Sequence, residues 1–314
     1  MDARAFDGVD IDWEYSDAPD RGGKEDDTEN MVKLFETLRA TFDKASRDFG
    51  LTFTIPASYW YLKYFDMPGL LKYADWTNLM SYDIHGVWNK ENAIGLVIQP
   101  HTNLTEIQLA VELLWRVNIP PSQVSMGFGF YGRAFTLADP SCNTPGCAFS
   151  GASKAGMCTG TGGYLAYYEI ENILLDNPEI LPVYDEEAAA KYFSWNSNQW
   201  ISYDDAETWK AKVDWANCVG LGGSLIWASD LDTYTGVAHQ GLTGKNASDN
   251  DALIADAVSA IVKMETADLV TSNLDQDCFR FPDCVDLDNS LVSSCGTGYT
   301  KEVFVTGTRF GIIA

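Results

Sequence analysis

The most regular alternation of apolar and polar residues lies near the start of the chain, over residues 6–15. The apolar members are Val9, Ile11 and Trp13, and the acidic members between them are Asp10, Asp12 and Glu14. A period of two is typical of a β-strand, so the carboxylates share one face and the large apolar side chains share the other. Like charges this close resist ionising together, and we expect at least one of their pKa values to be raised. A solvated edge strand would also be acidic, but it needs no apolar face.

Beyond this strand, strand-like and helix-like patterns follow one another at short intervals. Short apolar runs predict strands over 51–57, 76–83, 123–133 and 223–230. Apolar residues at helical spacing predict helices over 28–39, 105–118 and 205–216, with a further helical stretch through Met67 and Leu71. This alternation is typical of a parallel sheet built from βαβ units, so we expect five parallel strands when the acidic strand is included.

The character of the sequence changes twice along the chain. From about residue 139 it is rich in Cys, Gly and Ser and then mixes a short helix at 168–175 with short strands. Beyond 240 it continues with a predicted helix at 251–264 and three cysteines. We therefore expect four parts. They are part of a barrel with the acidic strand at 1–137, a Cys-containing α+β insertion at 138–203, the last barrel helix and strand at 204–239, and a Cys-containing tail at 240–314.

Composition and charge narrow the range of partners. The 314 residues are 46% hydrophobic, which is enough for a large core. With 21 basic and 45 acidic residues the formal net charge is −24, which argues against nucleic acid and against an anionic membrane surface. The sequence contains no apolar run of about 20 residues that could span a membrane. Ten Trp, 15 Tyr and 15 Phe supply flat faces on which sugar rings pack, although most aromatic residues in any protein belong to the core.

The seven cysteines lie at 142, 147, 158, 218, 278, 284 and 295. Their polar, Gly-rich surroundings are typical of disulfides formed in an oxidising compartment, and the odd number leaves one unpaired. Zinc is the alternative, but no two cysteines have CxxC spacing and the histidines are scattered, so we expect neither a metal nor another cofactor. Glycosylation triplets at Asn103 and Asn246 agree with secretion, whereas we find no signal peptide at the start of the chain.

Residues able to take part in chemistry follow the predicted strands. In a closed parallel barrel the active site forms at the carboxyl ends of the strands. The residues at these ends are Glu14, Tyr59, Tyr82, Asp83, Tyr131, Arg133 and Trp227. Residues from five separate strands would then lie together at one end of the barrel.

Several motifs, in this order, resemble those of one family. Asp7-Gly8-Val9-Asp10-Ile11-Asp12-Trp13-Glu14 is similar to the DGxDxDxE signature of glycoside hydrolase family 18, the chitinases. Met80-Ser81-Tyr82-Asp83, Tyr131-Gly132-Arg133 and the strand at 223–227 resemble later motifs of that family. The Cys-rich insertion and residues 163–171 resemble secreted fungal chitinases of the killer-toxin-like subgroup, class V. The resemblance runs from residue 6 to about 235.

This resemblance implies a role for each matching residue. Glu14 would protonate the glycosidic oxygen and then activate water, Asp12 would orient the N-acetyl group of the substrate, and Asp10 would share a proton with Asp12. Tyr82 would hydrogen-bond the acetamido oxygen, which itself attacks the anomeric carbon, so that configuration is retained without a protein nucleophile. The residues expected to bind substrate are Asp83, Tyr131, Arg133, Trp227, Tyr15 and Tyr59. For Arg133 and Trp227 the alternatives are an internal ion pair and plain packing.

The resemblance also implies a fold, a substrate and a location. The fold would be an α/β partial TIM (β/α)8 barrel with about five of its eight strands and an inserted α+β subdomain. Because the acidic strand is the fourth in the family, we expect the first three strands to be missing, together with the signal peptide of a secreted full-length relative. The function would be hydrolysis of β-1,4-linked N-acetylglucosamine in chitin or chito-oligosaccharides, carried out by a monomer.

Three alternatives stay open at this point. The first is a non-catalytic chitin-binding protein of the same family, although such proteins usually lack the acid that Glu14 provides here. The second is a truncated chitinase whose open sheet exposes its edges and which is inactive. The third is an endo-β-N-acetylglucosaminidase, which shares the acidic motif but not the Cys-rich insertion.

Overall fold

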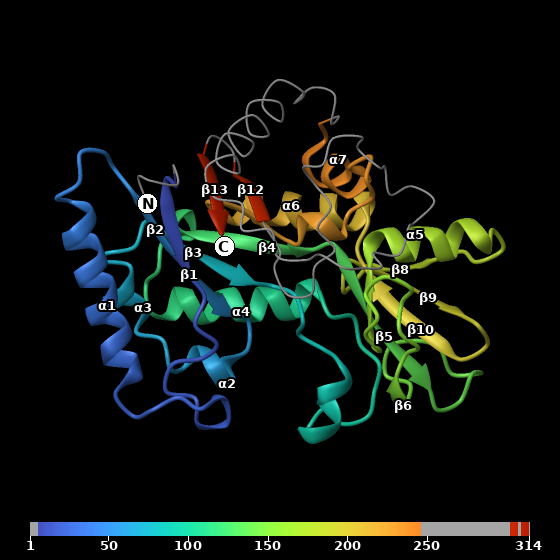
Figure 1. Cartoon of the computed structure of the whole chain (residues 1–314). Helices are drawn as coiled ribbons and strands as arrows, with labels where there is room; N and C mark the ends of the chain where they lie inside the picture. Colours follow the sequence, from blue (N-terminus) through green and yellow to red (C-terminus); the bar gives the residue numbers. More distant parts are fainter. Residues whose placement is uncertain (1–5, 246–301, 307–308, 314) are drawn as a thin grey trace, which may run out of the picture.

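A five-stranded parallel sheet forms the centre of the molecule (Figure 1). The computed structural model describes residues 6–245 and, by their backbone alone, two strands at 302–306 and 309–313. The central strands are β1 (Gly8–Ile11), β2 (Gly50–Pro56), β3 (Trp76–Met80), β4 (Val124–Gly129) and β11 (Gly223–Trp227). They lie side by side in the order β1-β2-β3-β4-β11, and every pair is parallel. The predicted partial barrel of five strands is confirmed.

Amphipathic helices connect and cover these strands. The helices are α1 (Asp27–Phe42), α2 (Tyr59–Leu62), α3 (Met67–Leu70), α4 (Leu104–Arg116), α6 (Ala206–Val219) and α7 (Val237–Thr243). Short 3-10 helices are η2 (Pro19–Arg21), η3 (Val87–Glu91), η4 (Pro121–Gln123) and η5 (Ser229–Leu231). Met31 and Phe35 of α1 are buried, and the Phe35 ring meets Phe53 of β2 edge-on with centroids 5.3 Å apart. The apolar spacing that predicts α1 is therefore the face that packs on the sheet.

A second, antiparallel sheet lies beside the first (Figure 1). Its strands are β5 (Tyr131–Leu137), β6 (Phe149–Ala152), β7 (Tyr164–Ala166), β8 (Val183–Asp185), β9 (Ala190–Trp195) and β10 (Gln199–Tyr203). Their order is β6-β5-β10-β9-β8, β7 pairs with β5, and helix α5 (Tyr167–Asp176) follows β7. The predicted α+β subdomain is confirmed, whereas the division of the chain at 137, 203 and 239 stays a prediction.

The chain passes from one sheet to the other at Phe130. The single strand that the sequence predicts over this stretch is wrong, because β4 and β5 lie on either side of this residue and belong to different sheets. The Phe130 N–H donates to the Trp227 carbonyl at 2.8 Å, and the Phe130 carbonyl accepts from the Tyr167 N–H at 2.9 Å. These bonds satisfy a fully buried backbone outside either ladder. Tyr131 and Arg133 therefore follow directly on the carboxyl end of β4.

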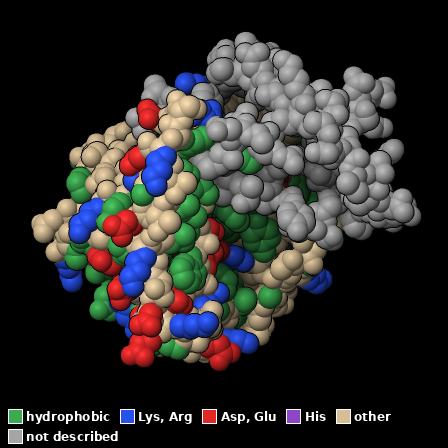
Figure 2. Space-filling view, turned by 60° about the vertical axis from the view of Figure 1, so that its left-hand side comes forward, with side chains coloured by type: hydrophobic (Ala, Val, Ile, Leu, Met, Phe, Trp, Pro, Cys, Tyr) green, Lys and Arg blue, Asp and Glu red, His purple; other side chains and the backbone are tan. Residues whose placement is uncertain are grey.

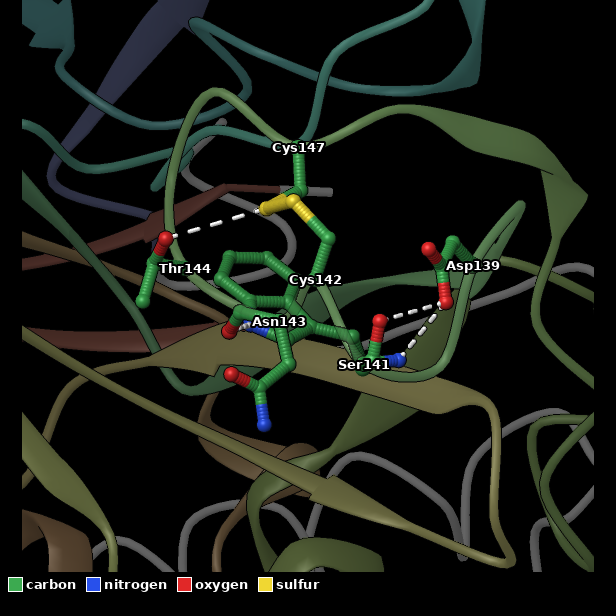
Figure 3. The surroundings of a disulfide bond; sticks show 7 residues. Asp139, Ser141, Cys142, Asn143, Thr144 and Cys147 are labelled. Atoms are coloured by element: carbon green, nitrogen blue, oxygen red, sulfur yellow. Dashed lines mark hydrogen bonds between the residues drawn. A yellow bond between two sulfur atoms is a disulfide. The ribbon is translucent and has the colours of Figure 1, made fainter.

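A disulfide closes the loop between β5 and β6 (Figure 3). Cys142 and Cys147 are joined, and Ser141 donates to Asp139 in the same loop. The indole N–H of the buried Trp200 donates to the Asn143 carbonyl at 2.9 Å, which ties the loop to a small second core. The expected disulfide chemistry is confirmed for this pair. Cys278, Cys284 and Cys295 lie outside the described residues.

The parallel sheet has two edge strands, β1 and β11. A separate antiparallel pair, β12 (Glu302–Thr306) and β13 (Arg309–Ile313), lies next to them, with β12 near β11 and β13 near β1 (Figure 1). The helix predicted at 251–264 falls outside the described residues. Within the part of the chain that the structure describes, no helix is both long and apolar enough to cross a membrane.

Candidate active site

Asp10 is the innermost of the three carboxylates that begin on β1. Its Oδ1 accepts hydrogen bonds from the Thr52 hydroxyl on β2 and from Asn78 Nδ2 on β3, the latter at 2.8 Å. Its Oδ2 is buried and has no hydrogen-bond partner in the described part of the chain. Burial, with a smaller contribution from the charge of Asp12, raises the pKa of Asp10 to about 6, although the two hydrogen bonds oppose this. Asp10 can therefore hold a proton close to neutral pH.

Asp12 and Glu14 follow β1 and are exposed to solvent. The Thr54 hydroxyl donates to Asp12 Oδ1 at 2.5 Å, so alternate threonines of β2 hold alternate aspartates of the first strand. Packing around the Glu14 carboxylate raises its pKa, with the hydrogen bond from Tyr15 acting against this and the charge of Asp12 adding to it. The carboxylates thus become more accessible from Asp10 outward, and a ligand can reach the outer two.

An aromatic stack supports the segment that follows Glu14. Tyr15 is buried, and its ring stacks on that of Tyr61 in α2 with centroids 4.3 Å apart. The Arg21 guanidinium lies 5.7 Å and 5.4 Å from these two rings, and its Nε donates to the Tyr61 hydroxyl at 3.3 Å. Tyr59 on the same helix leaves 64% of its surface exposed. Helix α2 therefore contributes Tyr61 to the stack, while Tyr59 stays outside it.

A second aromatic cluster lies at the carboxyl ends of β3, β4 and β11. Its members are Tyr82, Tyr131 and Leu225, with Tyr164 and Trp227 packed against them. The rings of Tyr82 and Tyr131 meet edge-on with centroids 6.0 Å apart. The Tyr131 hydroxyl is buried and lacks a hydrogen-bond partner among the described residues. Burial, with a smaller contribution from the charge of Asp83, raises the pKa of Tyr131 well above its usual value, so this hydroxyl keeps its proton.

Asp83 and Arg133 form an ion pair beside this cluster. Arg133 Nε and Nη2 donate to the two Asp83 carboxylate oxygens at 2.7 Å and 2.6 Å. Burial opposes ionisation of Asp83, but the hydrogen bonds and the charge of Arg133 prevail and hold its pKa well below the usual range. The charge of Asp83 makes a small contribution to the raised pKa of Glu14. Arg133 thus forms the internal ion pair named above as an alternative, with 20% of its side chain exposed.

The predicted site residues lie on or follow β1, β2, β3, β4, β5 and β11 at one end of the parallel sheet; Tyr59, which follows β2, is exposed and outside the aromatic stack. Several residues at this end are not predicted from the sequence. They are Arg21, Thr52, Thr54, Tyr61, Asn78, Trp88, His101 and Tyr164. The alternation of β2 could have indicated the two threonines, because Asp10 pairs with Thr52 in the sheet register. The loop residues have no local pattern that distinguishes them.

The described side chains provide carboxyl groups and aromatic faces. A carboxyl group with a raised pKa can give and take a proton near neutral pH, and aromatic rings pack against the apolar faces of a ligand. Among the described residues, no group of three His, Cys, Asp or Glu side chains is placed to hold a metal ion. The geometry therefore favours acid–base chemistry on a ligand with apolar faces.

Comparison with known proteins gives one family and several relatives. The family Glycosyl hydrolases family 18 matches residues 1–232. Among curated proteins, a probable chitinase from Penicillium expansum, LysM11, is 31% identical in an alignment 252 residues long, which covers 72% of this chain and 22% of that protein. The chain therefore spans well under half the length of this relative.

Solved structures share the fold over most of the chain. The group IV chitinase of Ostrinia furnacalis, in complex with allosamidin, gives a TM-score of 0.66 at 30% identity and covers 80% of this chain and 68% of its own. Human YKL-39, a pseudo-chitinase with retained chitooligosaccharide binding, gives a TM-score of 0.66 at 29% identity and covers 75% of this chain and 66% of its own. Since one neighbour is a chitinase and the other a pseudo-chitinase, similarity alone does not separate hydrolysis from binding.

Proposed function

The chain belongs to glycosyl hydrolase family 18, and from this membership we propose that it hydrolyses the β-1,4 linkages of chitin with retention of configuration. The observation that carries the proposal is the strand end at which Asp10, Asp12 and Glu14 follow one another, with the pKa of Asp10 and of Glu14 both raised. The activity is inferred from this site, because the chain spans only 22% of the relative named a probable chitinase.

Glu14 is the general acid and base of this reaction. Its carboxyl group gives a proton to the glycosidic oxygen as the bond between that oxygen and the anomeric carbon breaks, and its carboxylate later takes a proton from the water that attacks the same carbon. In the first step the N-acetyl oxygen of the substrate bonds to the anomeric carbon, so no covalent bond to the protein is needed. The solvent exposure of Glu14 supports this role, because both the sugar and the water must reach it.

In this proposal Asp12 positions the acetamido group of the substrate, and Asp10 holds the proton that the two aspartates share. The Asp12 carboxylate, held by Thr54, orients that group and stabilises the positive charge that its nitrogen gains as the oxygen attacks. An ionised Asp12 also raises the pKa of Glu14 and so keeps the proton there. Asp10, whose pKa is raised to about 6, holds the proton that the two aspartates share, so that Asp12 is left ionised during this step.

The aromatic cluster binds the sugar. In this proposal Tyr82 donates to the acetamido oxygen, and Trp227 provides an apolar floor beneath the ring. The buried Tyr131 ring meets Tyr82 edge-on and supports it beneath the sugar. The remaining proposed residues are Asp83, Arg133 and Tyr15, which hold the aromatic side chains in place or contact substrate hydroxyls. The exposed Tyr59 contacts a more distant sugar unit of the substrate.

We further propose that the substrate is a chitin chain or chito-oligosaccharide bound outside the cell by a monomer. The disulfide between Cys142 and Cys147 supports an oxidising compartment.

Release of product from a chito-oligosaccharide tests this function. The test variant is Glu14→Gln, and the matched control is Glu29→Gln, which removes an exposed carboxylate on α1 that pairs with Lys33 at 2.7 Å. We expect Glu14→Gln to lose about 10²- to 10⁴-fold in rate, the usual contribution of general acid catalysis, and Glu29→Gln to match the unmodified chain. Equal rates for the unmodified chain and Glu14→Gln would exclude the assignment.

A second candidate function is binding of chito-oligosaccharides without cleavage. It is favoured by the similarity to YKL-39, a pseudo-chitinase that retains chitooligosaccharide binding. The presence of Glu14 at the strand end counts against it. Calorimetric binding of a chito-oligosaccharide by a folded sample that releases no product would favour this candidate over hydrolysis.

A further inference from the structure

We propose that His101 is a positioning residue of the active site, whose neutral imidazole fixes the backbone at Asp83 and at the start of β5 and thereby holds the Asp83–Arg133 ion pair. The proposal rests on the function proposed above, because activity is one of its readouts. His101 lies between η3 and α4 and is completely buried. It therefore acts through its neighbours and not by touching substrate.

Both ring nitrogens of His101 contact the main chain of the site. Nε2 lies 3.2 Å from the Tyr131 carbonyl oxygen, which can only accept, so Nε2 carries a proton. Nδ1 accepts from the Asp83 N–H at 3.3 Å, so Nδ1 carries none. The Asp83 carboxylate is 3.7 Å from Nδ1, which is longer than the main-chain bond. Together the two main-chain bonds define one neutral tautomer, and burial, which lowers the pKa of His101, favours the same state.

The hydrogen bond that His101 Nδ1 accepts comes from Asp83, whose backbone has an uncommon conformation. Asp83 has a φ of 57°, in the left-handed region that residues other than glycine adopt rarely. A buried N–H without a partner costs about 1–3 kcal/mol, so the Nδ1 acceptor helps to keep Asp83 in this conformation. From it, the carboxylate receives both donors of Arg133 at 2.7 Å and 2.6 Å.

The main chain of His101 connects the same two segments. Its carbonyl accepts from the Ile84 N–H at 3.0 Å, directly after Asp83. Its N–H donates at 3.3 Å to the hydroxyl of Ser202, the residue of β10 that pairs with Arg133 in the antiparallel sheet. The imidazole also packs on the Tyr131 ring with centroids 4.9 Å apart. His101 therefore contacts the immediate neighbours of both members of the ion pair.

Two amide variants separate the two side-chain hydrogen bonds. His101→Asn keeps an acceptor near the position of Nδ1 and loses the donor to Tyr131, whereas His101→Gln reaches the position of Nε2 and loses the acceptor for Asp83. Because the Asp83 N–H is the group with the strained backbone, we expect His101→Gln to lower kcat/KM for a chito-oligosaccharide about 10- to 100-fold, mainly through KM. We expect His101→Asn to change it less than about threefold.

His85 provides a matched control for loss of a buried histidine. It lies two residues after Asp83 and is hydrogen-bonded to Asn89 at 2.8 Å and to Glu106 at 2.7 Å. His85→Asn should lower the midpoint of urea unfolding and leave KM unchanged. Equal KM values for the two His101 variants, or the same rise in KM for His85→Asn, would overturn the positioning role.

The tautomer of His101 can be measured without any activity. At pH 7 the ¹⁵N chemical shifts of the ring should show a proton on Nε2 and none on Nδ1. A proton on Nδ1 would overturn the proposal whatever the activity. If the tautomer is as expected but the unmodified chain has no turnover, the proposed hydrolysis fails by itself. The dissociation constant for the oligosaccharide then replaces KM in the comparison of the variants.

Discussion

At the scale of single residues, ionisation of the buried Asp10 carboxyl group lowers the free energy of unfolding. Its pKa rises from an ordinary value of 3.8 to about 6 in the folded chain. Between these two values the folded state binds more protons than the unfolded state, so the free energy of unfolding falls as pH rises through this window. The contribution of Asp10 to stability is therefore best below about pH 4 and is lost by about pH 6.

Replacing Asp10 by Asn should remove this dependence. An Asn Oδ1 can still accept from Thr52 and Asn78, and the side chain no longer ionises. We expect Asp10→Asn to be more stable than the unmodified chain at pH 7 by up to about 3 kcal/mol, with the difference closing below about pH 4. Urea unfolding at both pH values measures this. A difference of the same size at both would contradict the argument.

At the scale of elements, Gly127 sets the fit of β4 against β3 and Tyr82. A Cβ at this position would lie 2.6 Å from the Leu79 carbonyl oxygen and 2.8 Å from the Tyr82 ring. We expect Gly127→Ala to cost about 1–3 kcal/mol in unfolding free energy, through overpacking of the sheet, and to lower activity by shifting Tyr82. The control is Gly151→Ala in β6, where a Cβ meets no atom within 4 Å and where we expect a change within about 0.5 kcal/mol. Chemical denaturation that gives equal stabilities for the two variants would refute this.

The sequence predicts helices and strands wherever the apolar residues recur at one regular spacing. The alternation around Asp10 predicts β1 and the spacing of Met31 and Phe35 predicts α1, because each pattern records which face packs against the core, partly buried in β1 and fully buried in α1. The sequence does not predict the change of sheet at Phe130, because that run is buried on both sides of the break and has no local signal. The same holds for Tyr164, whose ring reaches Tyr131 from another strand. Residues of the site that come from one strand are thus predictable, and those joined by tertiary packing are not.

At the scale of the whole molecule, Lys212 of α6 connects the barrel part of the chain to the antiparallel sheet. Its ammonium is buried and donates to the Asp204 carboxylate, to the Ala189 carbonyl at 2.8 Å and to the Thr102 hydroxyl at 3.3 Å. Lys212→Met would leave the Asp204 charge buried and unpaired, so we expect a loss of about 3–5 kcal/mol in unfolding free energy.

Lys210 on the same helix is the control for this prediction. It is exposed and pairs with Asp214 one turn away, so Lys210→Met should change stability by less than about 1 kcal/mol. Thermal unfolding of both variants, followed by circular dichroism, compares them. If Lys212→Met lost no more stability than Lys210→Met, Lys212 would not have the connecting role argued here.

The net charge of −24 determines how the whole molecule meets a charged substrate. On the face in Figure 2 acidic and basic side chains are interspersed, so short-range contacts there have both signs, while at a distance the excess of acidic residues governs the field. A neutral chito-oligosaccharide feels little of this field. A partly deacetylated oligomer carries ammonium groups, which the field attracts at low ionic strength and which salt screens.

We therefore expect kcat/KM for the partly deacetylated oligomer to fall several-fold between about 10 mM and about 500 mM salt, where the screening length shrinks from about 30 Å to a few ångströms. For the fully acetylated oligomer we expect a change below about twofold, since no net charge is attracted. The proposed mechanism still requires an N-acetyl group on the unit whose linkage is cleaved, so the ammonium groups must lie on flanking units and the reducing ends of the products must be acetylated. Initial rates measure the two salt dependences, and product analysis measures the acetylation of the reducing ends. The same salt dependence for the two oligomers would show that long-range charge plays no part in substrate capture.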